Sequence, residues 1–316
     1  HANMKKPSIK PRLSSAPFHS PMWIYLNTKF VKDEDAVISV FDHGFLYGDG
    51  VYETLRSYGP HIFMQDQHLS RLFRSAEAIG LTIPISMKNL ADILQEAMIR
   101  NEVGTDQRDA YLRITVSRGA GDIGLDPALC SSPTVVVMAK PLVPPASHLY
   151  ETGVKLIVAS TKRNLPSALS PQIKSTNFLN NIQAKREALA AGAFDSILLN
   201  WEQHLTECTI SNVFLVVDRT LRTPALECGL LDGITRMIVI QLARELAIRT
   251  DEGRYTVDDL FKADECFLTN TSMEIMPVTS VDRRAVGDGK PGPLTLKLRE
   301  QFPAIRGRYG NMLHTR

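Results

Sequence analysis

The sequence predicts a mixed fold, α+β or α/β, made of two lobes. Strand patterns rich in β-branched residues alternate with helix patterns along most of the chain. A stretch with three prolines and no periodicity, Lys140–Gly153, divides these patterns into two groups. The chain has 316 residues and is 44% apolar, which suits one large or two medium-sized domains. A cleft between two lobes is the default place for a ligand.

Four segments are expected along the chain. Residues 1–21 begin with HANM, which resembles an expression-tag remnant, and continue as a loose tail rich in Pro, Ser and Lys. Residues 22–140 are predicted to form a small N-terminal α/β domain, and residues 141–153 an interdomain loop. Residues 154–316 are predicted to form a larger C-terminal domain.

The elements of the N-terminal domain follow from local patterns. In chain order these predict a strand–turn–strand unit at Met22–Val31, alternating apolar residues and glycines at Ser39–Gly59, helices at His68–Gly80 and Ser86–Asn101, and strands at Ala110–Gly119 and Thr134–Lys140. Ser86 is the expected N-cap of the second helix, because its hydroxyl can accept from a free N–H of the first turn.

The C-terminal domain shows the same mixture. Apolar, β-branched runs predict strands at Val154–Ser160, Asp195–Asn200, Asn212–Val217 and Glu265–Asn270. Helices are predicted between them over 177–191 and 235–248. No internal repeat interrupts this order.

Composition excludes several classes of partner. The net charge of +2 gives no electrostatic basis for binding nucleic acid. No apolar run has the roughly 20 residues of a membrane span, so no membrane partner is expected. The four cysteines show neither CxxC pairing nor metal spacing, and we expect reduced thiols in a cytoplasmic protein. No metal site is predicted, and His43, His68 and Arg118 are interpreted as structural residues.

Lys174 is the first candidate for chemistry. It stands alone before an amphipathic helix that begins in an Asn-rich turn, in the stretch Ser170–Gly192. Glu207 lies between a turn and an apolar strand, where a partly buried carboxylate needs a cationic partner. A glycine followed by Ile234 and Thr235 opens the helix after Gly229, and free N–H groups at such a start can bind an anion.

Two further features could complete an anion site. The stretch Leu268–Val278 contains a strand that ends in the turn Thr-Asn-Thr-Ser, and this turn offers several hydroxyl and N–H donors. Arg71 on a predicted helix could clamp a phosphate with two N–H groups. Taken singly, each feature also fits an ordinary helix start, a water-facing Glu, a polar loop or a solvated Arg. Together they indicate a lysine that forms a Schiff base with an aldehyde cofactor.

At this point the sequence resembles the class IV aminotransferases, which are pyridoxal-phosphate enzymes of fold type IV. The resemblance covers about Trp23 to Tyr309, through seven motifs in order: VFDHGFLYGDGVYETLR, HLSRL, YLRITVSRGAGDIGLDP, IKSTNFLNNIQAK, LTECTISNVF, GLLDGITR and TNTSMEIMPV. It implies the two-domain D-amino-acid aminotransferase-like fold, with the C-terminal domain binding pyridoxal 5′-phosphate.

The resemblance also implies roles for individual residues. Lys174 matches the lysine that forms the Schiff base and moves the proton. Glu207 matches the carboxylate that pairs with the pyridine nitrogen. The phosphate cradle would be formed by Arg71, Ile234, Thr235 and Thr271, and Leu230 would pack against the cofactor ring.

For the substrate, the sequence looks most like prokaryotic branched-chain aminotransferases. Tyr111 and Arg113 match their Tyr-x-Arg pattern, in which the tyrosine helps to hold the α-carboxylate and the arginine can meet the side-chain carboxylate of glutamate. A 2-oxo acid such as 2-oxoglutarate would be the acceptor. The remaining implied positions are Tyr52 and Arg56 in the pocket wall, Ser272 and Met273 at the carboxylate pocket, and Tyr47 and Leu125 entering the neighbouring subunit's site of a homodimer.

Three departures from that group keep alternatives open. Phe178 replaces a tyrosine that would donate to the cofactor's phenolic oxygen, and Thr54 replaces a glycine. The turn with Ser272 and Met273 is bulkier than the usual one. These features favour a D-amino-acid or (R)-amine transaminase, or an aminodeoxychorismate lyase. A cofactor-binding protein without activity is disfavoured, because simple binding needs neither Lys174 nor Glu207.

Overall fold

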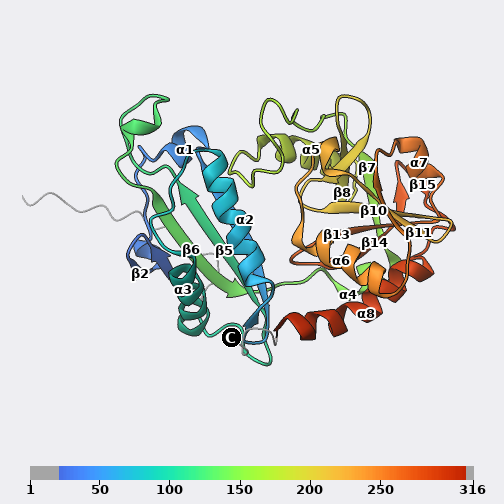
Figure 1. Ribbon diagram of the computed structural model, residues 1–316, viewed down its shortest axis with the longest axis horizontal. Coiled ribbons are helices and arrows are strands. Elements are labelled where there is room, and N and C mark those ends of the chain that lie inside the picture. Colours follow the sequence, from blue (N-terminus) through green and yellow to red (C-terminus); the bar gives the residue numbers. More distant parts are fainter. Residues whose placement is uncertain (1–20, 311–316) are drawn as a thin grey trace, which may run out of the picture.

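The computed structural model describes residues 21–310, with no side-chain description for 308–310. The tail predicted for residues 1–21 therefore lies outside the described residues, except for Pro21. Two lobes stand side by side, and each combines a sheet with helices (Figure 1). This mixed architecture confirms the predicted fold class. The division into domains at residues 141–153 stays a prediction.

The first lobe is built on an antiparallel sheet of six strands with the order β2-β1-β6-β5-β3-β4. The strands are β1 (Trp23–Leu26), β2 (Lys29–Lys32), β3 (Gly50–Tyr58), β4 (His61–Ile62), β5 (Ala110–Ser117) and β6 (Thr134–Pro141). β3 lies one place from the sheet edge, and its long pairing with β5 sets which side chains of the two strands share a face.

Three helices accompany this sheet: α1 (His43–Tyr47), α2 (Gln65–Ala78) and α3 (Met87–Arg100). The Ser86 side chain accepts a hydrogen bond from Asn89 N, which confirms the predicted N-cap of α3. α2 and α3 bury apolar faces against the sheet, in a core that includes Leu55, Leu72 and Leu94. Two short 3-10 turns lie at Asp33–Asp35 and Pro127–Leu129.

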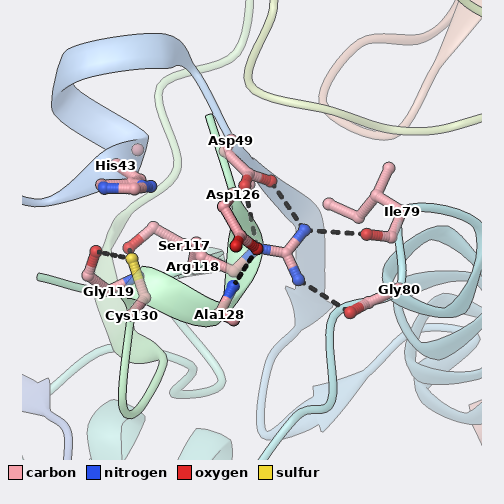
Figure 2. Close-up of polar contacts among 12 residues, drawn as sticks. His43, Asp49, Ile79, Gly80, Ser117, Arg118, Gly119, Asp126, Ala128 and Cys130 are labelled. Atoms are coloured by element: carbon pink, nitrogen blue, oxygen red, sulfur yellow. Dashed lines mark hydrogen bonds and ion pairs between the residues drawn. The ribbon is translucent and has the colours of Figure 1, made fainter. Parts of the chain in front are cut away.

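Arg118, directly after β5, ties three segments of the first lobe together (Figure 2). Its guanidinium contacts both carboxylate oxygens of Asp49 at 2.8 and 3.0 Å. It also donates to the carbonyl oxygens of Ile79 and Gly80, just past α2, at 2.8 and 2.7 Å. The structural interpretation of Arg118 is therefore confirmed, and the loop that leads into β3 is held firmly against α2.

The second lobe is built on a larger sheet in which β9 returns to β10. The path β12-β11-β10-β13-β14-β7-β8-β9 is joined by the pairing of Glu207 with Asn212, which closes a ring of strands. The strands are β7 (Val154–Val158), β8 (Asp195–Leu199), β9 (Leu205–Cys208), β10 (Asn212–Val217), β11 (Thr220–Pro224), β12 (Thr250–Gly253), β13 (Glu265–Asn270), β14 (Glu274–Val281) and β15 (Arg284–Ala285).

Five helices surround this sheet: α4 (Ser147–Thr152), α5 (Leu179–Ala190), α6 (Ile234–Glu245), α7 (Val257–Phe261) and α8 (Pro293–Gly310), with a 3-10 turn at Leu226–Cys228. α4 was not expected, since its segment was predicted to be a loop; a helix of six residues that directly follows a proline-rich stretch gives little periodic signal. α8 runs from the second lobe back toward the first (Figure 1). Among the described residues, no helix combines the length and the apolar character needed to cross a bilayer.

Candidate active site

A cavity lies between the lobes and is lined by residues of both. Tyr52 of β3 comes from the first lobe, and Lys174, Glu207 and Leu231 come from the second. An adjoining cavity of about 330 Å³ shares Tyr52 and Lys174 with it and extends toward the ends of β3 and β5. We call the part around Lys174 and Glu207 the cofactor end, and the adjoining part the substrate end.

Lys174 is fixed through its backbone, which leaves its side chain free to reach into the cavity. Its N–H donates to Ser75 Oγ on α2 at 3.1 Å, and its carbonyl oxygen accepts from Tyr52 N at 2.9 Å. The Nζ atom lies 4.5 Å from the centroid of the Tyr52 ring. Burial lowers the pKa of Lys174 to about 8, and the nearby Arg71 guanidinium acts in the same direction. A substantial fraction of the amine is thus unprotonated near neutral pH, as a nucleophile requires.

Glu207 sits at the seam where β9 meets β10, and it is only 5% exposed. Arg163 Nε donates to its Oε1 at 2.9 Å, and Leu231 N donates to its Oε2 at 3.1 Å. Burial raises the pKa of Glu207, although Arg163 opposes this shift. A buried carboxylate with remaining acceptor capacity and a raised proton affinity is suited to hold a protonated ring nitrogen.

Arg71 is held rigidly by a second buried carboxylate. Its Nε and one terminal nitrogen contact the two oxygens of Glu53 at 2.6 and 3.0 Å, and its other terminal nitrogen donates to Asp232 O at 2.8 Å. His68 Nδ1 lies 2.8 Å from Glu53 as well. Burial by itself would raise the pKa of Glu53, but Arg71 and His68 outweigh it and hold that pKa well below its usual range. The remaining N–H groups of Arg71 are oriented for an anion.

The N-terminus of α6 faces the same place. Gly233 is its N-cap and has no side chain to occupy the free N–H groups of Ile234 and Thr235. A Cβ atom on Gly233 would collide with Asn212 Oδ1, so only glycine fits. Arg71, Gly233 and Ile234 line one cavity. A guanidinium beside a helix N-terminus is a phosphate site in physical terms.

These groups fit pyridoxal phosphate. The hydroxyl of Ser211 is buried beside Lys174 and Glu207, and it has no hydrogen-bond partner among the described residues. A bound ring bearing polar substituents would satisfy such an orphaned group. The amine, the carboxylate and the phosphate site thus match the aldehyde, the ring nitrogen and the phosphate of this cofactor. The described residues contain no cluster of His, Cys, Asp or Glu that could hold a metal ion.

The substrate end is lined by side chains on the paired strands β3 and β5. Thr54 Oγ1 and the Tyr111 hydroxyl are 3.4 Å apart. The Arg113 guanidinium lies 4.0 Å from the centroid of the Tyr52 ring, and its Nε donates to Thr115 Oγ1 at 3.2 Å. Thr271 and Ser272 line the opposite wall, together with Phe178. Four of the eight predicted substrate residues therefore meet here: Tyr52, Tyr111, Arg113 and Ser272.

Leu230 does not lie at the predicted position against the cofactor ring. It is completely buried and does not line the cavity, whereas the next residue, Leu231, does. The chain turns between the end of a 3-10 turn and the start of α6, so a shift of one residue reverses which side chain faces the site. Of these two residues, Leu231 is therefore the one that lines the cavity.

Arg56 and Met273 also lie outside the cavity. Arg56 is 7% exposed, and its guanidinium contacts Asp109 at 2.7 Å and Glu274 at 3.2 Å. Met273 is buried in the apolar core of the second lobe. The prediction that both residues bind substrate is not supported by this geometry, because each side chain is already used elsewhere.

Tyr47 and Leu125 lie outside the cavity of their own chain. Leu125 is 83% exposed and Tyr47 is 36% exposed. The Tyr47 hydroxyl accepts from Gly124 N at 3.1 Å, which joins α1 to the loop that contains Leu125. Large apolar side chains on these two segments are exposed, among them Phe41, Phe45 and Ile123.

No role was predicted for Arg163, Glu53 or Ser211. Arg163 orients Glu207 across 44 positions of the chain, which only the fold brings together. Glu53 was detectable, because a carboxylate within the alternating apolar pattern of a strand points to a buried charge with a partner. Ser211 lies between Glu207 and a strand, and its burial was not visible from composition.

The chain belongs to the class IV aminotransferases. The sequence model described as amino-transferase class IV matches residues 50–281, more than half of the chain and all of the segments that form the site. The predicted class of enzyme, an aminotransferase of this family, is thereby confirmed.

Several curated proteins resemble the chain over nearly its whole length. A putative branched-chain-amino-acid aminotransferase from Methanocaldococcus jannaschii is 42% identical and covers 92% of this chain and 98% of its own. An aminodeoxychorismate lyase from Bacillus subtilis is 35% identical, with 82% and 86% coverage. A D-alanine aminotransferase from Listeria monocytogenes is 35% identical, with 89% and 95% coverage.

Solved structures agree on the fold. The Escherichia coli branched-chain amino acid aminotransferase superimposes with a TM-score of 0.88 at 30% identity and covers 93% of this chain and 98% of its own. The branched-chain amino acid aminotransferase from T.th., solved with pyridoxamine 5′-phosphate, gives a TM-score of 0.86 at 32% identity, with 92% and 95% coverage. The predicted fold type and cofactor are consistent with both, and the cofactor is pyridoxal 5′-phosphate.

Proposed function

We propose that the protein is a transaminase that moves the amino group between branched-chain or other hydrophobic L-amino acids, glutamate and 2-oxoglutarate. The observation that supports this most is that Lys174 and Glu207 line a cavity that continues to Tyr111 and Arg113. The Arg71 phosphate site forms a separate cavity, close enough for the Arg71 charge to lower the pKa of Lys174. The relative from M. jannaschii, described as a putative branched-chain aminotransferase, favours the same substrates.

The cofactor supplies an electron sink and a carbonyl carbon that alternately takes up and releases the amino group. Lys174 would hold the cofactor through Nζ, and its amine would be the base that takes the proton from the substrate's Cα. Its pKa of about 8 suits both steps, since the amine is a base near neutral pH and an acid after it has taken the proton. Tyr52, beneath the amine, keeps water away from this position.

The remaining cofactor-end residues orient the cofactor. Arg71 and the N–H groups of Ile234 and Thr235 would hold the phosphate, and Thr271, which lines the substrate end, would add a hydroxyl group. Glu207 would hold the proton on the ring nitrogen, and Arg163 fixes the direction of its carboxylate. Leu231 would pack on the ring. Glu207 and Arg71 are already fixed by protein contacts, so their electrostatic effect is preorganised.

The substrate end accounts for dual substrate use. Arg113 can form an ion pair with the side-chain carboxylate of glutamate, and its stacking on Tyr52 allows the same wall to present an apolar surface to leucine. Tyr111 and Ser272 offer hydroxyl groups to the α-carboxylate. Thr54 narrows the space behind them, because its hydroxyl contacts that of Tyr111.

A homodimer is part of the proposal. The exposed apolar side chains around α1 and the loop of Leu125 favour burial against a second copy, and Tyr47 and Leu125 would then reach the partner's cavity. The four cysteines are free, in keeping with a cytoplasmic location.

A transaminase for D-amino acids or (R)-amines is the second candidate. Phe178 favours it, since the ring contacts Tyr52 edge-on at 5.3 Å and gives the cofactor's phenolic oxygen no donor. The D-alanine aminotransferase relative is consistent with that alternative. The lyase relative adds a third candidate, elimination without an amino acceptor.

One product assay separates these functions. The purified protein with pyridoxal phosphate is given L-leucine, D-alanine, (R)-1-phenylethylamine or aminodeoxychorismate, each with and without 2-oxoglutarate, and chiral chromatography identifies the products. The proposal predicts L-glutamate and the keto acid of leucine, formed only when 2-oxoglutarate is present. Turnover of D-alanine or the amine alone would establish the second candidate. Pyruvate released from aminodeoxychorismate without an acceptor would establish the lyase.

A further inference from the structure

A polar cluster joins the two lobes beside the substrate end. Arg56 on β3 contacts Glu274 Oε1, at the start of β14, at 3.2 Å, and the Tyr58 hydroxyl donates to the same oxygen at 2.6 Å. Arg56 and Glu274 are 218 positions apart in the chain. We call Arg56, Tyr58 and Glu274 the interlobe latch, because they connect β3 of the first lobe to the β13–β14 turn of the second.

Arg56 is a buried cation that contacts two carboxylates, Glu274 within the latch and Asp109 outside it. The Arg56 guanidinium lies 4.1 Å from the centroid of the Tyr58 ring and contacts Asp109 at 2.7 Å in addition to Glu274. Burial raises the pKa of Tyr58, and the Glu274 carboxylate raises it further, so the hydroxyl remains a donor. A buried charge is maintained only by well-aligned partners, so these contacts fix the distance between the lobes at this point.

The latch also reaches a turn that lines the cavity. Arg56 donates to the carbonyl oxygen of Ser272 at 3.3 Å. Asn270 Oδ1 accepts from Ser272 N at 3.0 Å and from Met273 N at 2.8 Å, and these two hydrogen bonds hold the turn in one conformation. Thr271 and Ser272 of this turn, from the second lobe, line the same cavity as Thr54 and Tyr111 of the first lobe.

The backbone of Glu274 shows that the turn requires external support. Its φ angle is +60°, in the left-handed region that residues other than glycine and asparagine seldom adopt. Such a conformation persists only where the surroundings determine it. Arg56 and Tyr58 contact its carboxylate from the other lobe and supply that support, while Arg306 of α8 approaches the same oxygen at 3.7 Å.

We propose that Glu274 is a positioning residue that, through Arg56 and Tyr58, sets the width of the substrate end. The latch places Thr271 and Ser272 opposite Thr54 and Tyr111 without touching substrate. This inference rests on the proposed function, because it concerns the cavity in which that function is placed. It also explains why Arg56, expected in the pocket wall, is directed away from it.

The test compares Glu274→Ala, Glu274→Gln and Tyr58→Phe in the full-length holoenzyme. Glu274→Ala is expected to raise the KM of the amino donor on the order of 10- to 100-fold with kcat changed much less, because the chemical groups stay in place while the wall opposite them shifts. Glu274→Gln keeps an acceptor for Tyr58 and should recover part of the loss. Tyr58→Phe should fall between Glu274→Gln and the wild type.

Glu96→Gln is the matched control. Glu96 forms an exposed ion pair with Arg100 on α3, with side chains 48% and 38% exposed, and it lines neither end of the cavity. Its replacement should therefore leave KM within about twofold of wild type. Thermal unfolding is recorded for every variant. A role in stability alone would lower the melting temperature without changing KM, and that result in Glu274→Ala and Glu274→Gln would overturn the proposal. If Glu274→Ala does not fold, Glu274→Gln and Tyr58→Phe decide.

Failure of the proposed function has a different signature. If the wild type rejects L-leucine but accepts D-alanine or an amine, the substrate assignment is wrong, and the same KM comparison is made with the accepted donor. If it accepts no donor, the affinity of the apoenzyme for pyridoxal phosphate is compared, since Thr271 lies on the turn that the latch holds. Unchanged affinity in Glu274→Ala would then contradict the latch.

Discussion

The two ends of the cavity are built in different ways. At the cofactor end, Glu207 and Arg71 are buried, and each is fixed by at least two partners, one of them a backbone group. At the substrate end, Thr54, Tyr111 and Arg113 project from strand faces with longer contacts to other side chains, 3.4 Å and 3.2 Å. This contrast indicates that the type of reaction depends on rigid, preorganised groups, whereas the choice of substrate depends on side chains that can change without altering the fold.

Replacing Lys174 should have the largest effect, because it removes the group that binds the cofactor and moves the proton. Lys174→Ala is expected to lower kcat by at least about 10⁴-fold, since covalent and acid–base contributions are lost together. Stopped-flow or endpoint transamination measures the rate, and circular dichroism checks the fold. Residual activity within tenfold of wild type would place the chemistry elsewhere.

Glu207→Gln tests the other rigid group at the cofactor end. The amide cannot offer a negative charge to the ring nitrogen, so kcat should fall on the order of 10²- to 10³-fold while the substrate KM changes little. Arg163 would also lose its charged partner, which the absorption maximum of the bound cofactor should report. A variant with wild-type kcat would show that the ring nitrogen needs no carboxylate.

The pH dependence of cofactor capture probes the ionisation of Lys174. The amine is protonated below its pKa of about 8 and unprotonated above it. The rate at which the apoenzyme captures pyridoxal phosphate should therefore rise about tenfold per pH unit below pH 8 and level off above it. Stopped-flow absorption between pH 6 and 10 gives the profile. A rate still rising at pH 10 would mean that burial and Arg71 do not lower this pKa.

Arg113→Leu should have the smallest and most selective effect. The KM values of glutamate and 2-oxoglutarate are expected to rise about tenfold or more, since their side-chain carboxylates lose an ion pair, while that of leucine stays within about threefold. Steady-state assays with both donors measure the ratio. An equal rise in KM for leucine and glutamate would show that Arg113 does not recognise the substrate side chain. It would also contradict the division of roles between the two ends of the cavity.

Much of the cofactor end could be predicted because its signals are local. Lys174 precedes a recognisable helix, and the α6 start combines glycine with Ile234 and Thr235 in consecutive positions. Glu207 stands out as a carboxylate before an apolar strand. Each residue could therefore be singled out by its immediate neighbours, whereas its role was implied by the resemblance to the class IV aminotransferases.

The errors arose where register or distant contacts decide the position of a side chain. Tyr52, Thr54 and Arg56 occupy every second position of β3 and therefore share one face. The pattern alone could not show that the cavity ends before Arg56, while the strand continues. Glu274 of the second lobe accepts a hydrogen bond from the Arg56 guanidinium. Leu230 was misplaced by one residue in an irregular segment, where no periodicity fixes the direction of a side chain.

A single half-reaction is the most decisive test of the proposed transamination. The holoenzyme is mixed with L-leucine in the absence of any acceptor, and the absorption spectrum is followed as the aldehyde form of the cofactor converts to the pyridoxamine form. L-glutamate and D-alanine are run in parallel, with Lys174→Ala as the blank. We expect rapid conversion by L-leucine and L-glutamate, slow or no conversion by D-alanine, and none in the variant. Rapid conversion by D-alanine alone would contradict the assignment.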